Sequence, residues 1–196
     1  EAILDLGNAG GLLLDRDFAE ANHLLAGRRL STELAVGADG PRESVQLCLD
    51  RVGLGGLAFD GVSTVVTPGL TSHVPANVGL QLLSRFRLTI DFGGDRLWMT
   101  PYPDAISRPF RKNRTGLSLT PQEPGALVVD HVAVGSPAAL GGWKAGELIT
   151  AIDGAPIPAD YAAGEASMWI YGAPGRTVTL TLAGGARRSL TLADYF

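Results

Sequence analysis

A single aspartate, Asp5, follows the apolar pair Ile3–Leu4 and is itself followed by Leu6 and Gly7. A carboxyl group at the end of an apolar, strand-like segment is a candidate general acid or base. When two carboxyl groups lie close enough to share a proton, one acts as a base toward water and the other, protonated, polarises a carbonyl. Asp5 is only one such group, so this chemistry requires a second carboxyl from elsewhere.

The other residues able to do chemistry argue against several kinds of site. Cys48 is the only cysteine, so the chain has no internal disulfide and no zinc-binding cysteine spacing. The three histidines, His23, His73 and His131, lie far apart and form no HExxH motif. We therefore expect no metal site and no metal or organic cofactor.

Composition limits the fold class and the partners. Of the 196 residues, 45% are hydrophobic and 18% are charged, which is enough to bury a sizeable core. The net charge of −4 gives no reason to expect nucleic acid as a partner. No apolar run approaches the ~20 residues of a membrane-spanning helix. The 26 glycines and 12 prolines favour a mainly β fold of short strands joined by turns.

The first half is expected to contain strands and two short helices. Apolar residues at helical spacing after Asp15 predict a capped helix over residues 16–25. A second short helix is expected over 80–87, followed by a hairpin of 88–92 with 96–100. Further strands are expected at 32–36, 44–50 and 61–67, with turns at 38–41 and 53–56.

A boundary near residues 102–114 divides the chain into two domains. Prolines interrupt this stretch, and four basic residues make it typical of a solvated linker. We predict a first domain over residues 1–104, a linker over 105–113 and a second domain over 114–196.

The second domain contains a recognisable run of residues, SPAALGGWKAGELITAIDG, from Ser136 to Gly154. Ser136 and Pro137 predict a serine-capped helix with proline at its first position. An apolar strand and an Asp-Gly turn follow. This run resembles the middle of a bacterial PDZ domain, and the resemblance extends over residues 114–196. It implies a small barrel or sandwich of strands with two helices.

The PDZ resemblance also implies a binding site. Such domains add an extended peptide to a sheet edge, and amides of an apolar-Gly-apolar loop hold the terminal carboxylate of the peptide. The matching loop contains Gly116, and the candidate donors are the amides of Leu117, Ser118 and Leu119. A helix expected over 159–171 would form the second wall, with Ala163, Ser167 or Ile170 facing the peptide. Alternatively, the domain only acts as a scaffold, with its groove filled by its own chain.

The first domain resembles one lobe of a retropepsin-like aspartic protease. Asp5-Leu6-Gly7 stands at the catalytic loop, and Asn77-Val78-Gly79-Leu80 matches the turn that crosses beneath that loop. Residues 88–92 and 96–98 match the closing strands. The resemblance implies a barrel-like lobe that lacks its first strands, with a flap within 34–49 and a candidate tip at 37–40. We therefore expect the chain to be a piece of a longer protein.

Leu6 departs from the family pattern, since the family has a hydroxyl there that hydrogen-bonds across to the second loop. Two interpretations remain open. Asp5 is catalytic together with a second lobe, which lies upstream in the same chain or in a homodimer. Alternatively, the lobe is catalytically dead, and the protein is a peptide-binding adaptor or regulator.

A third interpretation comes from Gly7-Asn8-Ala9-Gly10-Gly11, which is similar to the nucleophile turn of trypsin-like serine proteases with alanine in place of serine. The pattern over 82–98 has no place in that fold. We therefore predict a bacterial aspartic endopeptidase acting on polypeptides, inactive as this fragment alone, whose PDZ domain binds peptide C-termini. The resemblance implies an extracytoplasmic location, in the periplasm or cell envelope.

Overall fold

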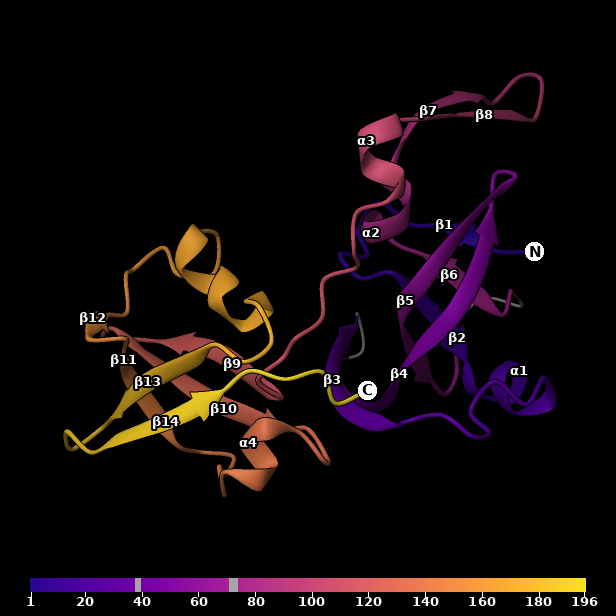
Figure 1. Cartoon of the computed structure of the whole chain (residues 1–196). Coiled ribbons are helices and arrows are strands. Elements are labelled where there is room, and N and C mark those ends of the chain that lie inside the picture. The colour runs from indigo at the N-terminus through magenta and orange to yellow at the C-terminus, as the bar shows by residue number, and fades with distance from the viewer. Residues whose placement is uncertain (38–39, 71–73) are drawn as a thin grey trace. The chain divides into compact units, whose positions relative to one another are not determined.

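The computed structural model describes residues 1–37, 40–70 and 74–196. The fold is mainly β, as the composition predicts. It forms two compact units, one of residues 1–30 and 45–111, the other of residues 31–44 and 112–196 (Figure 1). No helix in the described residues is both long and apolar enough to cross a membrane.

The first unit is built on strands in the order β1-β6-β2-β5-β4. Strand β3 follows β4 in the order of this sheet, but β3 and the first residues of β4 belong to the second unit. The bounds are β1 Ile3–Leu4, β2 Leu12–Asp15, β3 Ser31–Gly37, β4 Gly40–Leu54, β5 Leu57–Thr67 and β6 Ala76–Val78. The described strands of this sheet form an open path and not the closed barrel that the resemblance implied.

Strands β4 and β5 form a long antiparallel hairpin, in register from Val45↔Val66 to Leu54↔Leu57. The turn between them is made by Gly55 and Gly56, whose φ angles are +60° and +79°. Only glycine adopts such angles without a steric cost, which explains why the glycine-rich stretch predicted a turn here.

The first helix, α1, spans Arg16–Ala21 and is shorter than predicted. Asp15 caps it as expected, since its Oδ1 accepts from the amides of Asp17 and Phe18. The helix stops early because His23 has a φ of +54°, outside the helical region.

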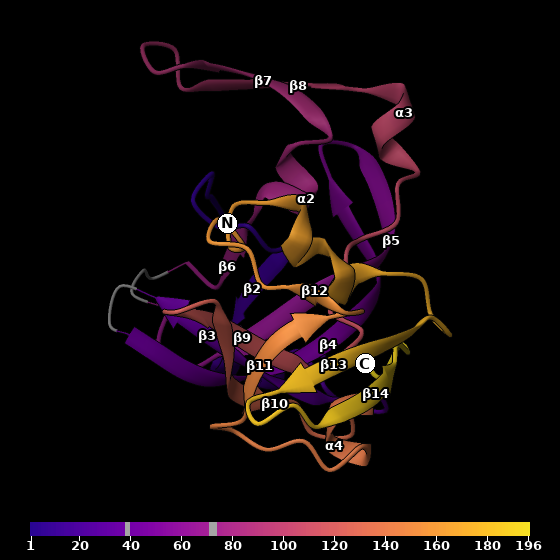
Figure 2. The ribbon, with the colours of Figure 1, turned by 90° about the vertical axis from the view of Figure 1, so that its left-hand side faces the viewer.

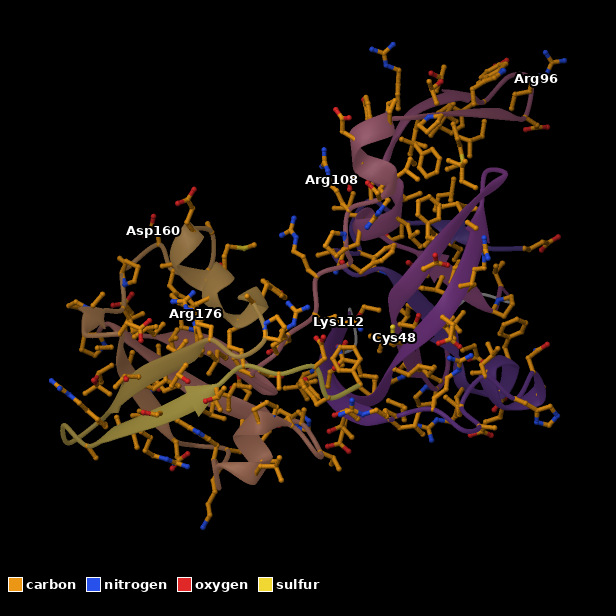
Figure 3. The ribbon with its side chains drawn as sticks, in the orientation of Figure 1. Cys48, Arg96, Arg108, Lys112, Asp160 and Arg176 are labelled. Atoms are coloured by element: carbon orange, nitrogen blue, oxygen red, sulfur yellow. The ribbon has the colours of Figure 1, made fainter. Side chains whose placement is uncertain are left out.

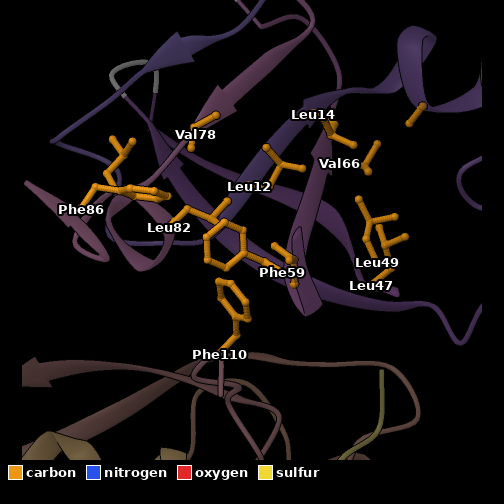
Figure 4. Close-up of a cluster of buried hydrophobic side chains, with 13 residues drawn as sticks. Leu12, Leu14, Leu47, Leu49, Phe59, Val66, Val78, Leu82, Phe86 and Phe110 are labelled. Carbon is orange, nitrogen blue, oxygen red and sulfur yellow. The ribbon is translucent and has the colours of Figure 1, made fainter. Parts of the chain in front are cut away.

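The core of the first unit gathers around Phe59, which is 2% exposed (Figure 4). Its ring makes edge contacts with Phe86 and Phe110 at centroid distances of 5.9 and 6.5 Å. Leu82 of α2 (Leu80–Leu83) packs in the same cluster, and Ile106 of α3 (Pro103–Ile106) packs against it. Because Phe110 is buried here, much of the stretch predicted as a linker packs as part of this unit.

A two-stranded hairpin extends from this core, as predicted. Strands β7 (Phe86–Asp91) and β8 (Arg96–Pro101) pair antiparallel with each other, in a sheet that contains no other described strand. In Figures 1 and 2 the hairpin lies beyond the ends of the other strands of its unit and extends to one side. Several of its apolar side chains are exposed, namely Ile90, Phe92, Leu97 and Trp98.

The second unit has a sheet in the order β14-β13-β11-β10-β9, with β12 paired to β11. Helix α4 (Pro137–Leu140) lies on one side of these strands in Figure 1, and the 3-10 helix η1 (Glu165–Tyr171) lies on the other. The strand bounds are β9 Leu117–Gln122, β10 Ala126–Val132, β11 Leu148–Ile152, β12 Ala155–Pro156, β13 Thr177–Leu182 and β14 Arg187–Thr191.

The helix expected over residues 159–171 is much shorter than predicted. Residues 159–164 form turns, and helical structure is confined to η1. Gly164 adopts an extended conformation at the start of η1, which separates it from the preceding turns. Buried Trp169 donates its indole N–H to buried Tyr161 at 2.7 Å, so the turns and η1 are fixed to one core.

The segment 31–44 belongs to the second unit, although the sequence placed it in the first domain. The Ser31 hydroxyl donates to the carbonyl of Val134 at 2.7 Å, and the amide of Val134 donates to Thr32 Oγ1 at 3.2 Å. Thr32 Oγ1 also lies 2.8 Å from His131 Nε2. These bonds join residues about a hundred positions apart, so no local pattern could predict them.

Candidate functional site

Asp5 lies at the beginning of a loop that connects two strands which are not neighbours. Strand β6 lies between β1 and β2, parallel to β1 and antiparallel to β2. The chain therefore leaves β1 at Leu4 and passes through residues 5–11 before it re-enters the sheet beyond β6. The amide of Asp5 donates to the carbonyl of Val78 at 3.0 Å, which fixes the start of this loop to β6.

Both carboxylate oxygens of Asp5 accept a hydrogen bond. Oδ1 accepts from the amide of Gly7 at 2.8 Å, and Oδ2 accepts from Asn77 Nδ2 at 2.8 Å. These hydrogen bonds favour the charged form and so hold the pKa of Asp5 below its usual value. The bond from Asn77 has the largest effect, and the bond from Gly7 comes next. The carboxylate is therefore ionised and held in one orientation.

Asn77 is oriented in turn by a second asparagine. Asn8 Nδ2 donates to Asn77 Oδ1 at 2.9 Å, and Asn8 Oδ1 accepts from the amide of Gly10 at 2.8 Å. Neither Asn8 nor Asn77 was predicted from the sequence to be a site residue. The sequence did contain a signal, since Asn8 directly follows Asp5-Leu6-Gly7 and Asn77 begins the turn that matches it. The contact between the two side chains spans 69 positions, so local spacing did not reveal it.

The Asn77–Leu80 turn passes directly against the Asp5 loop. A Cβ on Gly79 would lie 2.4 Å from the carbonyl oxygen of Gly10, so only glycine fits. The amide of Leu80 donates to the carbonyl of Asn8 at 2.7 Å, and that of Gly79 to the carbonyl of Gly11 at 2.9 Å. The structure therefore brings together the two segments that the sequence paired.

The outer side of the loop is open. Asp5 is partly exposed, and the neighbouring Leu6 is 62% exposed and carries no hydroxyl. The hydrogen-bond partners of the Asp5 carboxylate described above are the amide of Gly7 and the side chain of Asn77, and neither is a carboxyl group. The described residues contain no group of three or more His, Cys, Asp or Glu side chains suited to a metal.

The predicted flap tip, residues 37–40, lies largely outside the described residues, since the structure does not describe 38–39. The described arms are β3 and β4. The beginning of β3 is bonded to residues 131–134, as described above. Glu43, near the start of β4, lies 3.6 Å from His131 Nδ1.

In the second unit, the predicted carboxylate-binding loop is closed by its own side chains. Asn113 Oδ1 accepts from the amides of Thr115 and Gly116, at 3.0 and 3.2 Å. Thr115 Oγ1 accepts from the amide of Leu117 at 2.9 Å, so this predicted donor is directed into the loop. Thr115, Gly116 and Leu117 are all buried.

Gly116 is required for packing. Its φ is +78°, and a Cβ would lie 2.1 Å from both Cβ and Oγ of Ser136. Ser136 is itself fully buried and caps α4, because its Oγ accepts from the amide of Ala139. A larger side chain at position 116 would therefore disturb the fold and is unsuitable as a test of binding.

The predicted peptide edge has the geometry needed for strand addition. Strand β9 ends the order of its sheet, so one side of its backbone faces no described strand. Ser118 and Leu119 are half-buried and, among the described strands, pair with β10 on the other side. Extended peptides add to such edges through main-chain hydrogen bonds.

The predicted second wall approaches the same loop. Ser167 and Ile170 are three positions apart on η1, so they lie on one face of a 3-10 helix. The carbonyl of Ile170 accepts from the amide of Arg114, within the loop 113–117, at 2.8 Å. Ser167 donates its hydroxyl to the carbonyl of Gly164, and Ala163 lies in the turns before η1.

Comparison with known proteins defines the class of the second unit. Residues 128–184 match the family of PDZ domains. The chain therefore contains a PDZ domain, with strand β9 and the loop 113–117 just before the matched residues.

Among solved structures, the chain is similar to a retropepsin-like aspartic protease from Rickettsia conorii, with 22% identity and a TM-score of 0.31. That match covers 45% of this chain and 63% of the other. It is also similar to two structures of the HtrA-type protease AlgW. The S227A form with a decapeptide has 16% identity and a TM-score of 0.37, and the match covers 84% of this chain and 58% of that one.

The other AlgW structure, also with a decapeptide, has 17% identity and a TM-score of 0.35, and the match covers 96% of this chain and 62% of that one. The chain thus spans about three fifths of the length of these proteins. No curated protein matches the sequence.

Proposed function

We propose that this chain is part of an aspartic peptidase in which Asp5 is one of two catalytic carboxyls and the PDZ domain binds peptides. The observation that carries the proposal is the Asp5 carboxylate, partly exposed on an open loop and held at both oxygens by Gly7 and Asn77. A carboxylate fixed in this way is pre-organised for proton transfer.

The roles follow from the pKa of Asp5. Hydrogen bonds from Asn77 and Gly7 lower that pKa, so Asp5 is suited to be the ionised member of a carboxyl pair. In such a pair the ionised member takes a proton from water, and the protonated member donates a hydrogen bond to the scissile carbonyl. The second carboxyl then comes from another lobe, upstream in the same protein or in a second copy.

The β7–β8 hairpin supports the need for a second lobe. Phe92 is 87% exposed, Ile90 50% and Trp98 47%. Ile90 lies opposite exposed Leu97 in the hairpin, and neighbouring exposed apolar side chains of this kind mark surfaces that other protein elements cover. The hairpin also offers unpaired strand edges within the described residues.

The PDZ domain is proposed to bind the C-termini of polypeptides and so to recruit or gate substrates. The open edge of β9 and the nearby Ile170 support this proposal. The closed state of loop 113–117 favours Ser118 and Leu119, more than Leu117, as main-chain partners of a peptide. We further propose a bacterial protein with an extracytoplasmic location, which cell fractionation of the source organism tests.

A second candidate is a catalytically dead lobe that serves as a peptide-binding adaptor. Two observations favour it. Leu6 stands where a hydroxyl would tie two such loops together, and Asn77 occupies Oδ2 of Asp5 with a hydrogen bond. The adaptor shares the PDZ function with the peptidase and differs only in the role of Asp5.

The test of catalysis is Asp5→Asn in the longer protein that contains this chain, assayed on an unfolded protein substrate. We expect kcat/KM to fall by about 10²- to 10⁴-fold, as for loss of an acid–base group. Asp60→Asn is the control, because Asp60 is an exposed aspartate of β5. Hydrolysis that survives Asp5→Asn contradicts the peptidase assignment, and absence of any hydrolysis in the parent supports the adaptor.

The test of peptide binding compares Ile170→Ala with Met168→Ala by fluorescence polarisation, using labelled peptides with apolar C-termini. Ile170 is the last but one residue of η1 and its carbonyl bonds Arg114, whereas Met168 lies on the same helix and is 40% exposed. We expect at least tenfold weaker binding for Ile170→Ala and no change for Met168→Ala. Equal affinities would remove η1 from the binding site.

A further inference from the structure

A small cavity in the first unit is lined by three arginines. It has a volume of about 90 Å³, roughly three times the ~30 Å³ that one water occupies in the liquid. It lies between the end of α2 and the segment after α3. The lining residues are Gln81, Ser84, Arg85, Arg108, Pro109 and Arg111, and none of them carries a carboxylate.

Arg85 is the buried member of this set, with 5% exposure. Its Nε donates to the carbonyl of Gln81 at 2.8 Å, and its Nη1 to the carbonyls of Ala105 and Ile106 at 3.0 and 2.9 Å. Its Cζ lies 4.0 Å from the ring centroid of Phe110. The guanidinium is therefore fixed in position by neutral groups only.

The other two arginines add positive charge at the same place. Arg108 is exposed and donates from Nε to the carbonyl of Asp104 at 3.2 Å. Arg111 is exposed, and its amide donates to Gln81 Oε1 at 2.8 Å. Among the described residues, no carboxylate forms an ion pair with Arg85, Arg108 or Arg111, and burial together with Arg108 lowers the pKa of Arg85.

Such a cluster of like charges is unfavourable unless an anion offsets it. Guanidinium groups donate to oxyanions through charge-assisted bonds, which are stronger than neutral ones. Nε and Nη1 of Arg85 already donate to carbonyls, so Nη2 is its remaining donor nitrogen, and Arg108 and Arg111 supply further donors. Ser84 adds a hydroxyl to the same wall, whereas the Gln81 amide bonds the backbone of Arg111 and holds that residue in place. A tetrahedral oxyanion with two negative charges fits this donor set better than a flat, singly charged carboxylate.

We propose that this cavity is a binding site for a small oxyanion of the phosphate class, with Arg85 at its base and Arg108 and Arg111 at its mouth. Arg108 is labelled in Figure 3. The site is separate from Asp5 and from the PDZ edge in its residues and its chemistry. The proposed anion site therefore goes beyond the peptidase proposal and does not depend on it.

The test is calorimetric titration of the whole chain with inorganic phosphate, at an ionic strength held constant with chloride. We expect one phosphate per chain, and at least tenfold weaker binding for the double variant Arg108→Gln, Arg111→Gln. These side chains are exposed, so their loss leaves the fold intact, whereas Arg85→Gln would disturb packing. Arg96→Gln on β8, also exposed and outside the cavity, is the matched control.

A second arm separates the sources of the anion. Phenyl phosphate represents a phosphate ester, and acetate represents a carboxylate. Binding of inorganic phosphate, alone or together with phenyl phosphate, supports the proposal and shows whether an ester also fits. The proposal is overturned by absence of phosphate binding, by stronger binding of acetate, or by equal losses in the double variant and in Arg96→Gln.

Discussion

The Asp5 loop and the 113–117 loop are both held by a hydrogen-bonded asparagine side chain, but one loop exposes its functional group and the other buries it. In each, an asparagine oxygen accepts from backbone amides two or three residues further on, Asn8 from Gly10 and Asn113 from Thr115 and Gly116. In the first unit this leaves a carboxylate partly exposed at the loop's start. In the second it directs the amides inward and buries them. A short Asn turn can therefore either present a reactive group or close a loop, depending on the residues around the asparagine.

The largest effect expected is on the stability of one unit alone. Phe59→Ala removes a fully buried ring from the first core and should cost about 3–5 kcal/mol. Trp98 reports on the first unit, and Trp143 and Trp169 on the second. In urea, phenylalanine replacement should shift only the transition of the first unit. Variants that each retain one of the three tryptophans allow the unfolding of each unit to be followed. Equal shifts at all three tryptophans would show that the units do not unfold separately.

The next largest effect is a pH dependence of the stability of the second unit. Burial raises the pKa of Glu33 in the second unit to about 7, and burial followed by the charge of Glu33 raises the pKa of Tyr195. Because the folded-state pKa of Glu33 exceeds the unfolded value of 4.5, the folded state binds the extra proton between these values. The stability of the second unit should therefore fall as pH rises from about 4.5 to about 7, by up to about 3 kcal/mol.

Glu33→Gln should remove most of this slope, because glutamine does not titrate. Chemical unfolding of the wild type and the variant at pH 4.5, 6 and 8 measures it. Stability that is the same at all three pH values in the wild type, or a slope that persists in the variant, would be inconsistent with a buried Glu33 carboxyl.

A smaller effect is expected at the closed loop. Gly116→Ala introduces both a positive-φ alanine and a clash with Ser136, for a loss of about 2 kcal/mol or more. Gly135→Ala is a matched control, because its φ is +70° but no atom lies within 4 Å of the added Cβ. That variant should lose only about 1 kcal/mol. Similar losses in the two variants would mean that the contact with Ser136 is not tight.

The smallest effect is expected in the loop that begins at Asp5. Asn77→Ala removes the hydrogen bond to Asp5 Oδ2 and should raise the pKa of Asp5 toward its usual value. The expected cost in stability is about 1 kcal/mol. A carboxyl-detected NMR titration measures the pKa, with Asn22→Ala as a control, since Asn22 bonds only near α1. An unchanged pKa would show that Asn77 does not act on the carboxyl.

Local signals in the sequence predicted most of the fold. The Ser136 cap of α4, the Asp15 cap of α1, the Gly55–Gly56 turn and the β7–β8 hairpin all follow from residue type and short-range spacing. The PDZ assignment rested on one continuous run of residues, which is why it could be predicted without a structure.

Long-range contacts account for the parts of the fold that the sequence did not predict. Segment 31–44 joins the second unit through Thr32 and His131, which are 99 positions apart. Phe110 lies in the stretch that was predicted as a linker, but it packs in the core against Phe59 and Arg85. These partners lie far upstream, so the local sequence did not reveal the packing. The helix over 159–171 was predicted from its pattern, but the extended backbone at Gly164 confines helical structure to η1.

The candidate site was predicted only in part. The pairing of the Asp5 loop with the Asn77–Leu80 turn followed from a motif, and the structure shows their contact. The asparagines that hold the carboxylate were not predicted, because their roles depend on side-chain geometry between distant segments. The catalytic role of Asp5 remains a prediction.

Binding of a statine-type transition-state analogue to the longer protein, or to a homodimer of this chain, tests the central claim most directly. The hydroxyl of such an inhibitor requires two carboxyls, one of them Asp5. Calorimetry should show one inhibitor per pair of lobes, with binding lost in Asp5→Asn and retained in Asp60→Asn. Binding that is unaffected by Asp5→Asn, or absent from the assembled protein, would contradict a catalytic Asp5.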